Sequence, residues 1–219
     1  MKKKYPELFF LNNLIKPGSF CIDIGANLGY YSIPMGRLSG NNGKVFSVEP
    51  VPVFQKILYS NLNRYNLQKT VEIIPFALGD SDDVEITMGT PIVDGLLHHG
   101  YTKIIEQKEN GFTEVYKVKM STPAKIFNNL EKLDFIKCDV EGYETHIIPN
   151  FRELILKFKP VCQIEIVPRE NKIELIKFFD SLGYETKYLN GHELNNYKLD
   201  GTECLDINDL YFIPIGKQA

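Results

Sequence analysis

The sequence has no strong excess of charge of either sign and no long hydrophobic run. Its 219 residues carry a formal net charge of -3, too small to mark a surface for nucleic acid or an anionic membrane. No stretch approaches the roughly 18 apolar residues that a membrane-spanning helix needs. The basic run Lys2-Lys3-Lys4 is followed by "LFFL", which ends at Asn12-Asn13 without a cleavage site. We therefore expect a solvated tail, no targeting segment, no nucleic-acid partner and no integral membrane segment.

The sequence also lacks any C-x-x-C pair. Its four cysteines, Cys21, Cys138, Cys162 and Cys204, are far apart, and three of them fall inside apolar runs that resemble strands. A free thiol in such a run behaves as a small core side chain, which predicts a reduced, cytoplasmic protein. Apolar residues at 43% and charged residues at 24% are typical of a globular domain, and the chain length predicts one domain, residues 1–219.

Apolar runs alternate with amphipathic segments along the chain. The pattern predicts strands at 20–24, 44–49, 71–78, 84–88, 114–120, 134–140, 161–167, 184–189 and 209–215, and helices at 29–38, 52–65, 122–130, 143–158 and 171–182. Strands that alternate with helices indicate an α/β fold with right-handed crossovers and a mainly parallel sheet. The last strand follows a long Asn-rich connection in place of a helix, so it could enter the sheet antiparallel.

Residues 89–113 have no clean period. We expect a loop or lid there, within an insert that spans 84–120, because long irregular segments of a compact domain often carry specificity.

The stretch "FCIDIGANLGYYS" (residues 20–32) ends a predicted buried strand on Asp23 and then places Gly25 and Gly29 four residues apart. Glycines let the backbone turn tightly and approach a ligand without a Cβ atom in the way. The dinucleotide fingerprint G-x-G-x-x-G needs a third glycine, which is missing here. Glu49 ends the second strand, 20 residues after Gly29, where a carboxylate can accept both hydroxyls of a ribose.

An acid at the turn repels a pyrophosphate but attracts an ammonium or sulfonium group. A lone glycine turn is a weak signal, and a Glu at a strand end is usually only solvated. Together, in register with a strand, turn, helix and strand, they indicate a nucleoside that carries positive charge, and S-adenosylmethionine is such a molecule.

The blocks "DIGANLGYYS", "VFSVEP" and "IKCDVEGYE", with "FALGD" and "QIEI", resemble the FkbM-type methyltransferase family over roughly residues 18–170. The resemblance implies a class I, Rossmann-like, doubly wound sheet of seven strands with an antiparallel last strand. It also implies methyl transfer to hydroxyl groups of sugars, glycolipids or natural products. By resemblance, Asp23, Gly25, Asn27 and Gly29 wrap the methionine part of the cofactor, Glu49 binds the ribose, and Phe76 and Ala77 lie near the adenine.

In the class I fold that the resemblance implies, the methyl acceptor meets the end of the fourth parallel strand, where Asp139 is followed two residues later by Glu141. A hydroxyl acceptor must lose its proton, and these two carboxylates are the best candidates for the general base, with His98 and His99 next. A structural role for Asp139, holding the methionine ammonium, stays open. Asp139, Glu141 and Glu165 are also hard oxygen ligands of the kind that Mg²⁺ or Ca²⁺ accepts, but the sequence fixes no distance between them, and we predict no metal site.

Other functions fit less well. An amino-group methyltransferase would carry an Asn/Asp-Pro-Pro-aromatic stretch where this chain has "CDVEGYE". A nicotinamide-dependent oxidoreductase could use the Tyr-x-x-x-Lys at Tyr65 and Lys69, but these residues fall at the wrong end of the predicted sheet. A catalytically silent S-adenosylmethionine-binding module remains an alternative. The sequence favours an S-adenosylmethionine-dependent O-methyltransferase that acts on a small-molecule or glycan acceptor, and homo-oligomerisation stays open.

Overall fold

A mixed eight-stranded sheet forms the centre of the protein. The computed structural model describes residues 6–105, 111–198 and 207–217. From one edge to the other, the strands are β12 (Glu193–Asn196), β11 (Tyr184–Asn190), β13 (Asp209–Pro214), β10 (Val161–Glu165), β9 (Phe135–Cys138), β1 (Phe20–Ile24), β2 (Lys44–Val48) and β3 (Val71–Ile74). The strands from β10 to β3 run parallel, and β13 lies antiparallel between β10 and β11.

The α/β class and the antiparallel last strand are thus confirmed, but the expected number of seven strands is wrong. The eighth strand, β12, pairs antiparallel with β11 through a short turn at Gly191 and extends the sheet at its edge. The sequence from Glu193 to Asn196 is polar and mostly exposed, so hydrophobic periodicity gave no signal for it.

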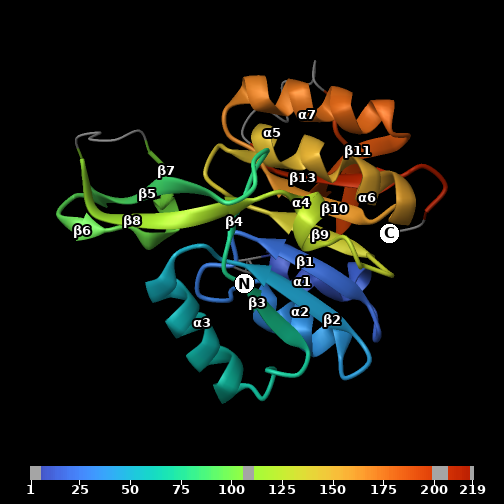
Figure 1. Cartoon of the computed structure of the whole chain (residues 1–219). Coiled ribbons are helices and arrows are strands. Elements are labelled where there is room, and N and C mark those ends of the chain that lie inside the picture. Colours follow the sequence, from blue (N-terminus) through green and yellow to red (C-terminus); the bar gives the residue numbers. More distant parts are fainter. Residues whose placement is uncertain (1–5, 106–110, 199–206, 218–219) are drawn as a thin grey trace.

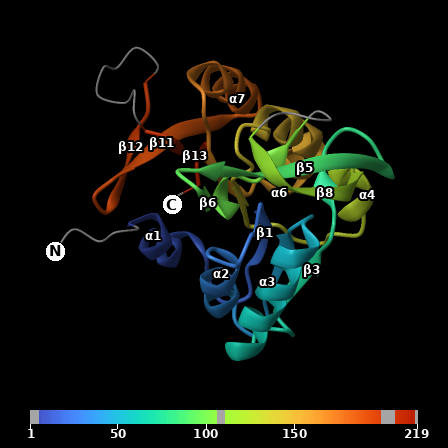
Figure 2. The same cartoon turned by 90° about the vertical axis from the view of Figure 1, so that its left-hand side faces the viewer.

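Helices cover both faces of the sheet (Figures 1 and 2). One face carries α1 (Pro6–Leu14), α2 (Ser32–Ser39) and α3 (Pro52–Arg64), and the other carries α4 (Pro123–Ile126), α5 (Glu144–Ile147), η2 (Ile148–Phe151), α6 (Arg152–Phe158) and α7 (Arg169–Ser181). Because side chains alternate along a strand, Cys21 packs in the core of the first face and Ile22 in the core of the second. Burying both faces requires the nearly continuous apolar strands seen here.

A second sheet projects from the first, at the left of Figure 1. It contains β4 (Ala77–Leu78), β5 (Val84–Val93), β6 (Leu96–Leu97), β7 (Lys103–Ile104) and β8 (Phe112–Ser121), and the short helix η1 (His99–Tyr101) lies between β6 and β7. The predicted single strand 71–78 is wrong, because the chain leaves the main sheet at Pro75 and β4 pairs with β8. The expected loop 89–113 also contains strand in its described part: β5 continues to Val93 through an irregularity between Thr90 and Pro91, and β6, β7 and the start of β8 follow.

Cys21, Cys138 and Cys162 are free and buried, as predicted, while Cys204 lies outside the described residues. In the described ranges, no helix combines the length and the apolar character that a membrane span requires.

Candidate functional site

A cavity of about 590 Å³ opens at the carboxyl ends of the parallel strands, which is where sheets of this kind bind ligands. Its walls come from the turn after β1, the ends of β2, β9 and β10, the start of β13, the helix α1 and the second sheet. Seven acidic residues line it: Glu7, Asp23, Glu49, Asp139, Glu141, Glu165 and Asp209. Its volume is that of a site for a small molecule or cofactor.

The glycine turn forms the floor of this cavity. Gly25 has φ +82°, and a Cβ atom there would lie 1.9 Å from the carbonyl oxygen of Asp139. The backbone N–H groups of Gly25 and Ala26 both donate to the carbonyl oxygen of Val48, at 3.1 and 3.0 Å. The turn therefore sits against the ends of both neighbouring strands, β2 and β9, and only glycine fits at position 25. The following helix begins at Ser32, three residues later than predicted.

Glu49 follows β2 and is nearly buried in the wall. Its Oε2 accepts a hydrogen bond from the backbone N–H of Asn27 and its Oε1 from that of Val51, both at 2.8 Å. Burial raises the pKa of Glu49 to about 7, although these two hydrogen bonds act to lower it. The structure thus brings Glu49 and the glycine turn together, while the ribose role of Glu49 stays a prediction.

Asp23 is buried below the turn and lines the cavity. Its Oδ2 accepts a hydrogen bond of 2.5 Å from Ser32 Oγ, and Ser47 Oγ donates to Ser32 Oγ at 2.7 Å. Burial raises the pKa of Asp23 to about 6, opposed by the Ser32 hydrogen bond and by the charge of Lys137. The hydrogen bond therefore fixes the position of the carboxyl group. Because its pKa is close to neutral, a positively charged ligand in the cavity would favour its ionised form.

Apolar side chains line the cavity beside Glu49, including the predicted Phe76 and Ala77. The sequence reading missed Val51 and Phe54. Phe54 is 2% exposed, and its ring meets the ring of His99 edge-on, with 5.2 Å between the centroids. Phe54 lies in the first turn of the helix that follows Glu49. Its closeness in sequence to Glu49 could have indicated that it lines the same site.

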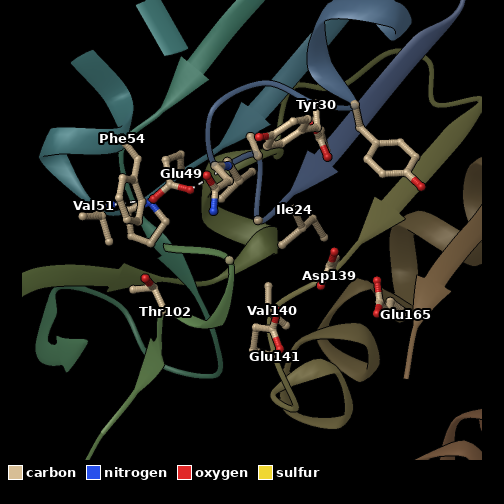
Figure 3. Close-up of a pocket in the computed structure, with 18 of the residues that line it drawn as sticks. Ile24, Tyr30, Glu49, Val51, Phe54, Thr102, Asp139, Val140, Glu141 and Glu165 are labelled. Carbon is tan, nitrogen blue, oxygen red and sulfur yellow. Dashed lines mark hydrogen bonds between the residues drawn. The ribbon is translucent and has the colours of Figure 1, made fainter. Parts of the chain in front are cut away.

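Figure 3 shows two ends of the cavity. Glu49, Val51 and Phe54 lie together on one side, and Asp139, Glu141 and Glu165 lie on the other. We call these the Glu49 end and the Asp139 end. The distance in sequence between these groups is large, so only the sheet brings them to one cavity.

The carboxyl groups at the Asp139 end are partly desolvated. Glu141 adopts φ +57° in the turn after β9. The residue is exposed overall, but partial desolvation of its carboxyl group on the cavity side raises its pKa to about 7, and the negative charges of Asp139 and Glu144 add to the effect. Glu165 has a pKa raised to about 8, through burial and then through the charges of Asp139 and Asp209. Both groups can therefore hold a proton near neutral pH.

The two histidines differ in position. His99 lines the cavity at the Glu49 end, where its carbonyl oxygen accepts from Asn27 Nδ2 at 3.1 Å. His98 is not part of the wall, and its ring stacks on that of Tyr101 at 5.4 Å. Both lie in the connection between β6 and β7 of the second sheet, and their catalytic role stays a prediction.

Across the described residues, no group of three or more His, Cys, Asp or Glu side chains has an arrangement that could hold a metal ion. Asp139, Glu141 and Glu165 line the same cavity without forming such a group. Tyr65 also lies apart from the cavity wall, with the guanidinium of Arg37 4.5 Å from the centre of its ring. The Tyr-x-x-x-Lys stretch therefore takes no part in this site.

Comparisons with known proteins agree with the geometry. The family model described as "Methyltransferase FkbM domain" matches residues 23–186. None of the curated proteins matches the chain. Among solved structures, methyltransferase FkbM from Methylobacillus flagellatus KT has a TM-score of 0.63 at 17% identity, over 96% of this chain and 48% of that one. The chain thus spans about half the length of that protein.

Two further structures are similar over nearly the whole chain. A putative rRNA-methylase from Clostridium thermocellum has a TM-score of 0.56 at 10% identity, over 94% of this chain and 90% of that one. A SAM-dependent O-methyltransferase from Thermotoga maritima has a TM-score of 0.50 at 15% identity, over 100% of this chain and 68% of that one. At these identities the structures show a shared fold. The family model, in contrast, covers well over half of the sequence, and the chain belongs to the FkbM family of methyltransferases.

Proposed function

We propose that the chain is an S-adenosylmethionine-dependent O-methyltransferase that acts on a hydroxyl group of a sugar, a glycolipid or a natural product. The charge of the cavity wall carries this proposal. Among the described residues that line the cavity, seven are Asp or Glu and none is Lys or Arg. Such a wall suits a nucleoside that carries positive charge. It disfavours a pyrophosphate, which proteins usually bind with Arg, Lys or a helix N-terminus.

The residues at the Glu49 end fit the adenosine part of this cofactor. Each carboxylate oxygen of Glu49 accepts one backbone N–H and keeps capacity for a second donor, so the pair of oxygens can accept two ribose hydroxyls. Val51 and Phe54 beside it offer apolar surface for the adenine. Asp23 supplies negative charge at the glycine turn for the methionine ammonium. The charge and the hydrogen-bonding capacity of these side chains therefore support this cofactor.

The chain contributes alignment and proton removal to the transfer. When bound, S-adenosylmethionine supplies the methyl group, whose bond to sulfur breaks as the bond to the acceptor oxygen forms, with the electron pair left on sulfur. Holding the reacting atoms in line accounts for much of the rate of such a displacement. Asp139 and Glu141 lie at the opposite end from Glu49, and they are the candidates that we propose for accepting the hydroxyl proton.

An aromatic side chain at the opening of the cavity favours an acceptor that has a ring. Tyr30 lines the cavity yet is 68% exposed, so its ring lies at the opening. An aromatic ring in this position can pack against the apolar face of a sugar or against another ring. Sugar and natural-product hydroxyls are also the acceptors that the resemblance to the family implies.

Isothermal titration calorimetry with S-adenosylhomocysteine tests the cofactor, with NAD as the comparison ligand. We expect binding of S-adenosylhomocysteine on the order of micromolar and no binding of NAD. EDTA should leave the affinity unchanged, since the described residues offer no three-ligand metal site. Binding of NAD alone would overturn the proposal in favour of an oxidoreductase. Failure of both ligands to bind would leave a catalytically silent domain.

A further inference from the structure

Three carboxyl groups lie side by side at the ends of adjacent strands in the cavity. Ile164 of β10 pairs with Cys138 of β9, so Glu165 and Asp139, the next residue in each chain segment, are neighbours across the sheet. Glu165 also pairs with Asp209 of β13 on its other side. All three carboxyl residues line the cavity. Backbone pairing, and not the flexible ends of long side chains, brings them together.

Lys137 neutralises one of these three groups. Its Nζ is 3.3 Å from Asp209 Oδ1, and its side chain is only 1% exposed. The same Asp209 oxygen accepts from Gln163 Nε2 at 2.9 Å. Asp209 therefore has its counter-charge and its donors within the sheet. Lys137 also faces Asp139 and Glu165, but its ion pair is with Asp209, so these two carboxyl groups remain as neighbours without an ion pair to it.

The pair holds a proton on Glu165. The charged groups that face Glu165 are Asp139 and Lys137 from the β9 segment and Asp209 from β13. Burial and the two carboxylates outweigh Lys137 and raise the pKa of Glu165 to about 8, and a hydrogen bond between the carboxyl groups of Glu165 and Asp139 contributes to the rise. The negative charge of a neighbouring carboxylate disfavours ionisation of Glu165, which keeps its proton to higher pH than an isolated carboxyl group.

We propose that Glu165 is a positioning residue for the transfer step: its protonated carboxyl group donates a hydrogen bond to Asp139 and holds the Asp139 carboxylate toward the methyl group. This inference rests on the proposed function, in which Asp139 accepts the proton of the acceptor hydroxyl. In that step the O–H bond breaks, the proton passes to Asp139, and Glu165 keeps its own proton throughout.

A carboxylate at a strand end that lacks such a partner can rotate about its side-chain bonds, and catalysis by proton transfer depends on its direction. The hydrogen bond from Glu165 removes this freedom at the Asp139 end. A hydrogen bond to a charged group contributes about 1.5–3 kcal/mol. For a ligand whose binding depends on the position of Asp139, this corresponds to roughly a tenfold to hundredfold change in the dissociation constant.

Sinefungin provides a probe that needs no knowledge of the acceptor. In this analogue a carbon atom bearing an amino group replaces the sulfonium and its methyl group, so an ammonium sits where the methyl would be. S-adenosylhomocysteine lacks that group. The ratio of the two dissociation constants, measured by calorimetry from pH 6 to pH 9, therefore reports on the negative charge held at the methyl position.

The variants are Glu165→Gln, Glu165→Ala and the matched control Glu185→Gln. Gln keeps an N–H donor for Asp139 but cannot ionise, while Ala removes the donor. Glu185 is also on a strand of the main sheet but is half-exposed and lies outside the cavity wall. Thermal melting of each variant shows that it is folded before its affinities are compared.

For the wild type and Glu185→Gln, we expect the preference for sinefungin to rise with pH toward about 8, as Glu165 ionises beside the ammonium. Glu165→Gln should keep the preference at pH 7 within about threefold but lose this rise, and Glu165→Ala should reduce the preference by about tenfold or more. Normal binding of S-adenosylhomocysteine by all the variants would show that the cofactor site is intact.

Two results would overturn the inference while leaving the proposed function in place. One is an unchanged preference for sinefungin in Glu165→Ala. The other is the same pH profile in Glu165→Gln as in the wild type, which would assign Glu165 a packing role only. Failure of the wild type to bind S-adenosylhomocysteine would instead remove the proposed function, and this inference with it.

Discussion

The α-carbon of Gly25 faces the carbonyl oxygen of Asp139 so closely that a Cβ atom would lie 1.9 Å from it. Gly25→Ala therefore adds a backbone clash to the cost of φ +82°. We expect the free energy of unfolding to fall by more than about 2 kcal/mol, together with loss of S-adenosylhomocysteine binding. Urea denaturation and calorimetry measure the two effects.

Gly183→Ala is the matched control for this prediction. Gly183 has a similar φ of +78°, but a Cβ atom there would have nothing within 4 Å. It should show only the cost of the left-handed backbone, about 1–2 kcal/mol. If the free energy of unfolding fell equally in the two variants, the backbone near Asp139 would be able to move away from the added Cβ atom at little cost.

Glu49→Gln should weaken S-adenosylhomocysteine binding by about 1.5–3 kcal/mol, the size of a charged hydrogen bond. The pKa of Glu49 is raised to about 7 without ligand, so wild-type affinity should improve as pH rises through 7 and the carboxylate forms. Glu49→Gln should lose this part of the pH dependence. Calorimetry from pH 5.5 to pH 8.5 measures it, and a variant with wild-type affinity would end the ribose role.

The stability of the ligand-free protein should decrease as pH rises from about 4.5 to 8. Asp23, Glu49, Glu141 and Glu165 all have raised pKa values in the folded state, about 6, 7, 7 and 8. Between the ordinary carboxyl pKa and these values, the folded state binds more protons than the unfolded state, so the free energy of unfolding falls as the protons leave.

Urea denaturation at a series of pH values measures this slope. Glu49→Gln and Glu165→Gln should each flatten it, because each removes one titrating group, whereas Glu185→Gln should leave it unchanged. A free energy of unfolding that rises between pH 5 and pH 8 would contradict the assignment of protons to these groups.

Lys137→Met should destabilise the fold by about 1–3 kcal/mol, because it removes the counter-charge of Asp209, whose side chain is only 24% exposed and keeps the donor of Gln163. The double variant Lys137→Met/Asp209→Asn should recover part of the loss, since no uncompensated charge remains. Lys117→Met is the control: its ion pair with Glu85 is exposed, and its loss should have little effect. Urea denaturation compares the three variants. If Lys137→Met had the stability of the wild type, Asp209 would not depend on Lys137 for its counter-charge.

The sequence located the parts of the site that lie at the carboxyl ends of apolar strands. Asp23 is the next-to-last residue of β1, and Glu49 and Asp139 directly follow β2 and β9, so a strand prediction also places each acid at this edge of the sheet. Asp209 was missed because it is the first residue of an antiparallel strand. Only the pairing of that residue with Glu165 brings the carboxyl group of Asp209 to the cavity. Lys137 was missed because a lysine within a strand gives no sign that it is buried.

The second sheet could not be predicted because its pairings are non-local. Pro75 ends β3, yet the apolar run continues through Leu78, and nothing in that run shows that Ala77 pairs with Met120. Similarly, Gly89 and Pro91 weaken the strand signal of β5. The backbone tolerates Pro91 at the irregularity in its register with β8.

The two ends of the second sheet are joined to each other. The backbone N–H of Gly79 donates to the carbonyl oxygen of Ser121, so the chain leaves and re-enters the domain at almost one point. This sheet contributes Met88, Thr102 and Ile104 to the cavity, whereas the glycine turn and the carboxylates belong to the main domain. Because the chain leaves and re-enters the main sheet at this point, a segment from another member of the family could be grafted between Gly79 and Ser121 to test whether it alters the choice of acceptor, provided that the graft keeps the contacts of His99 with Asn27 and Phe54.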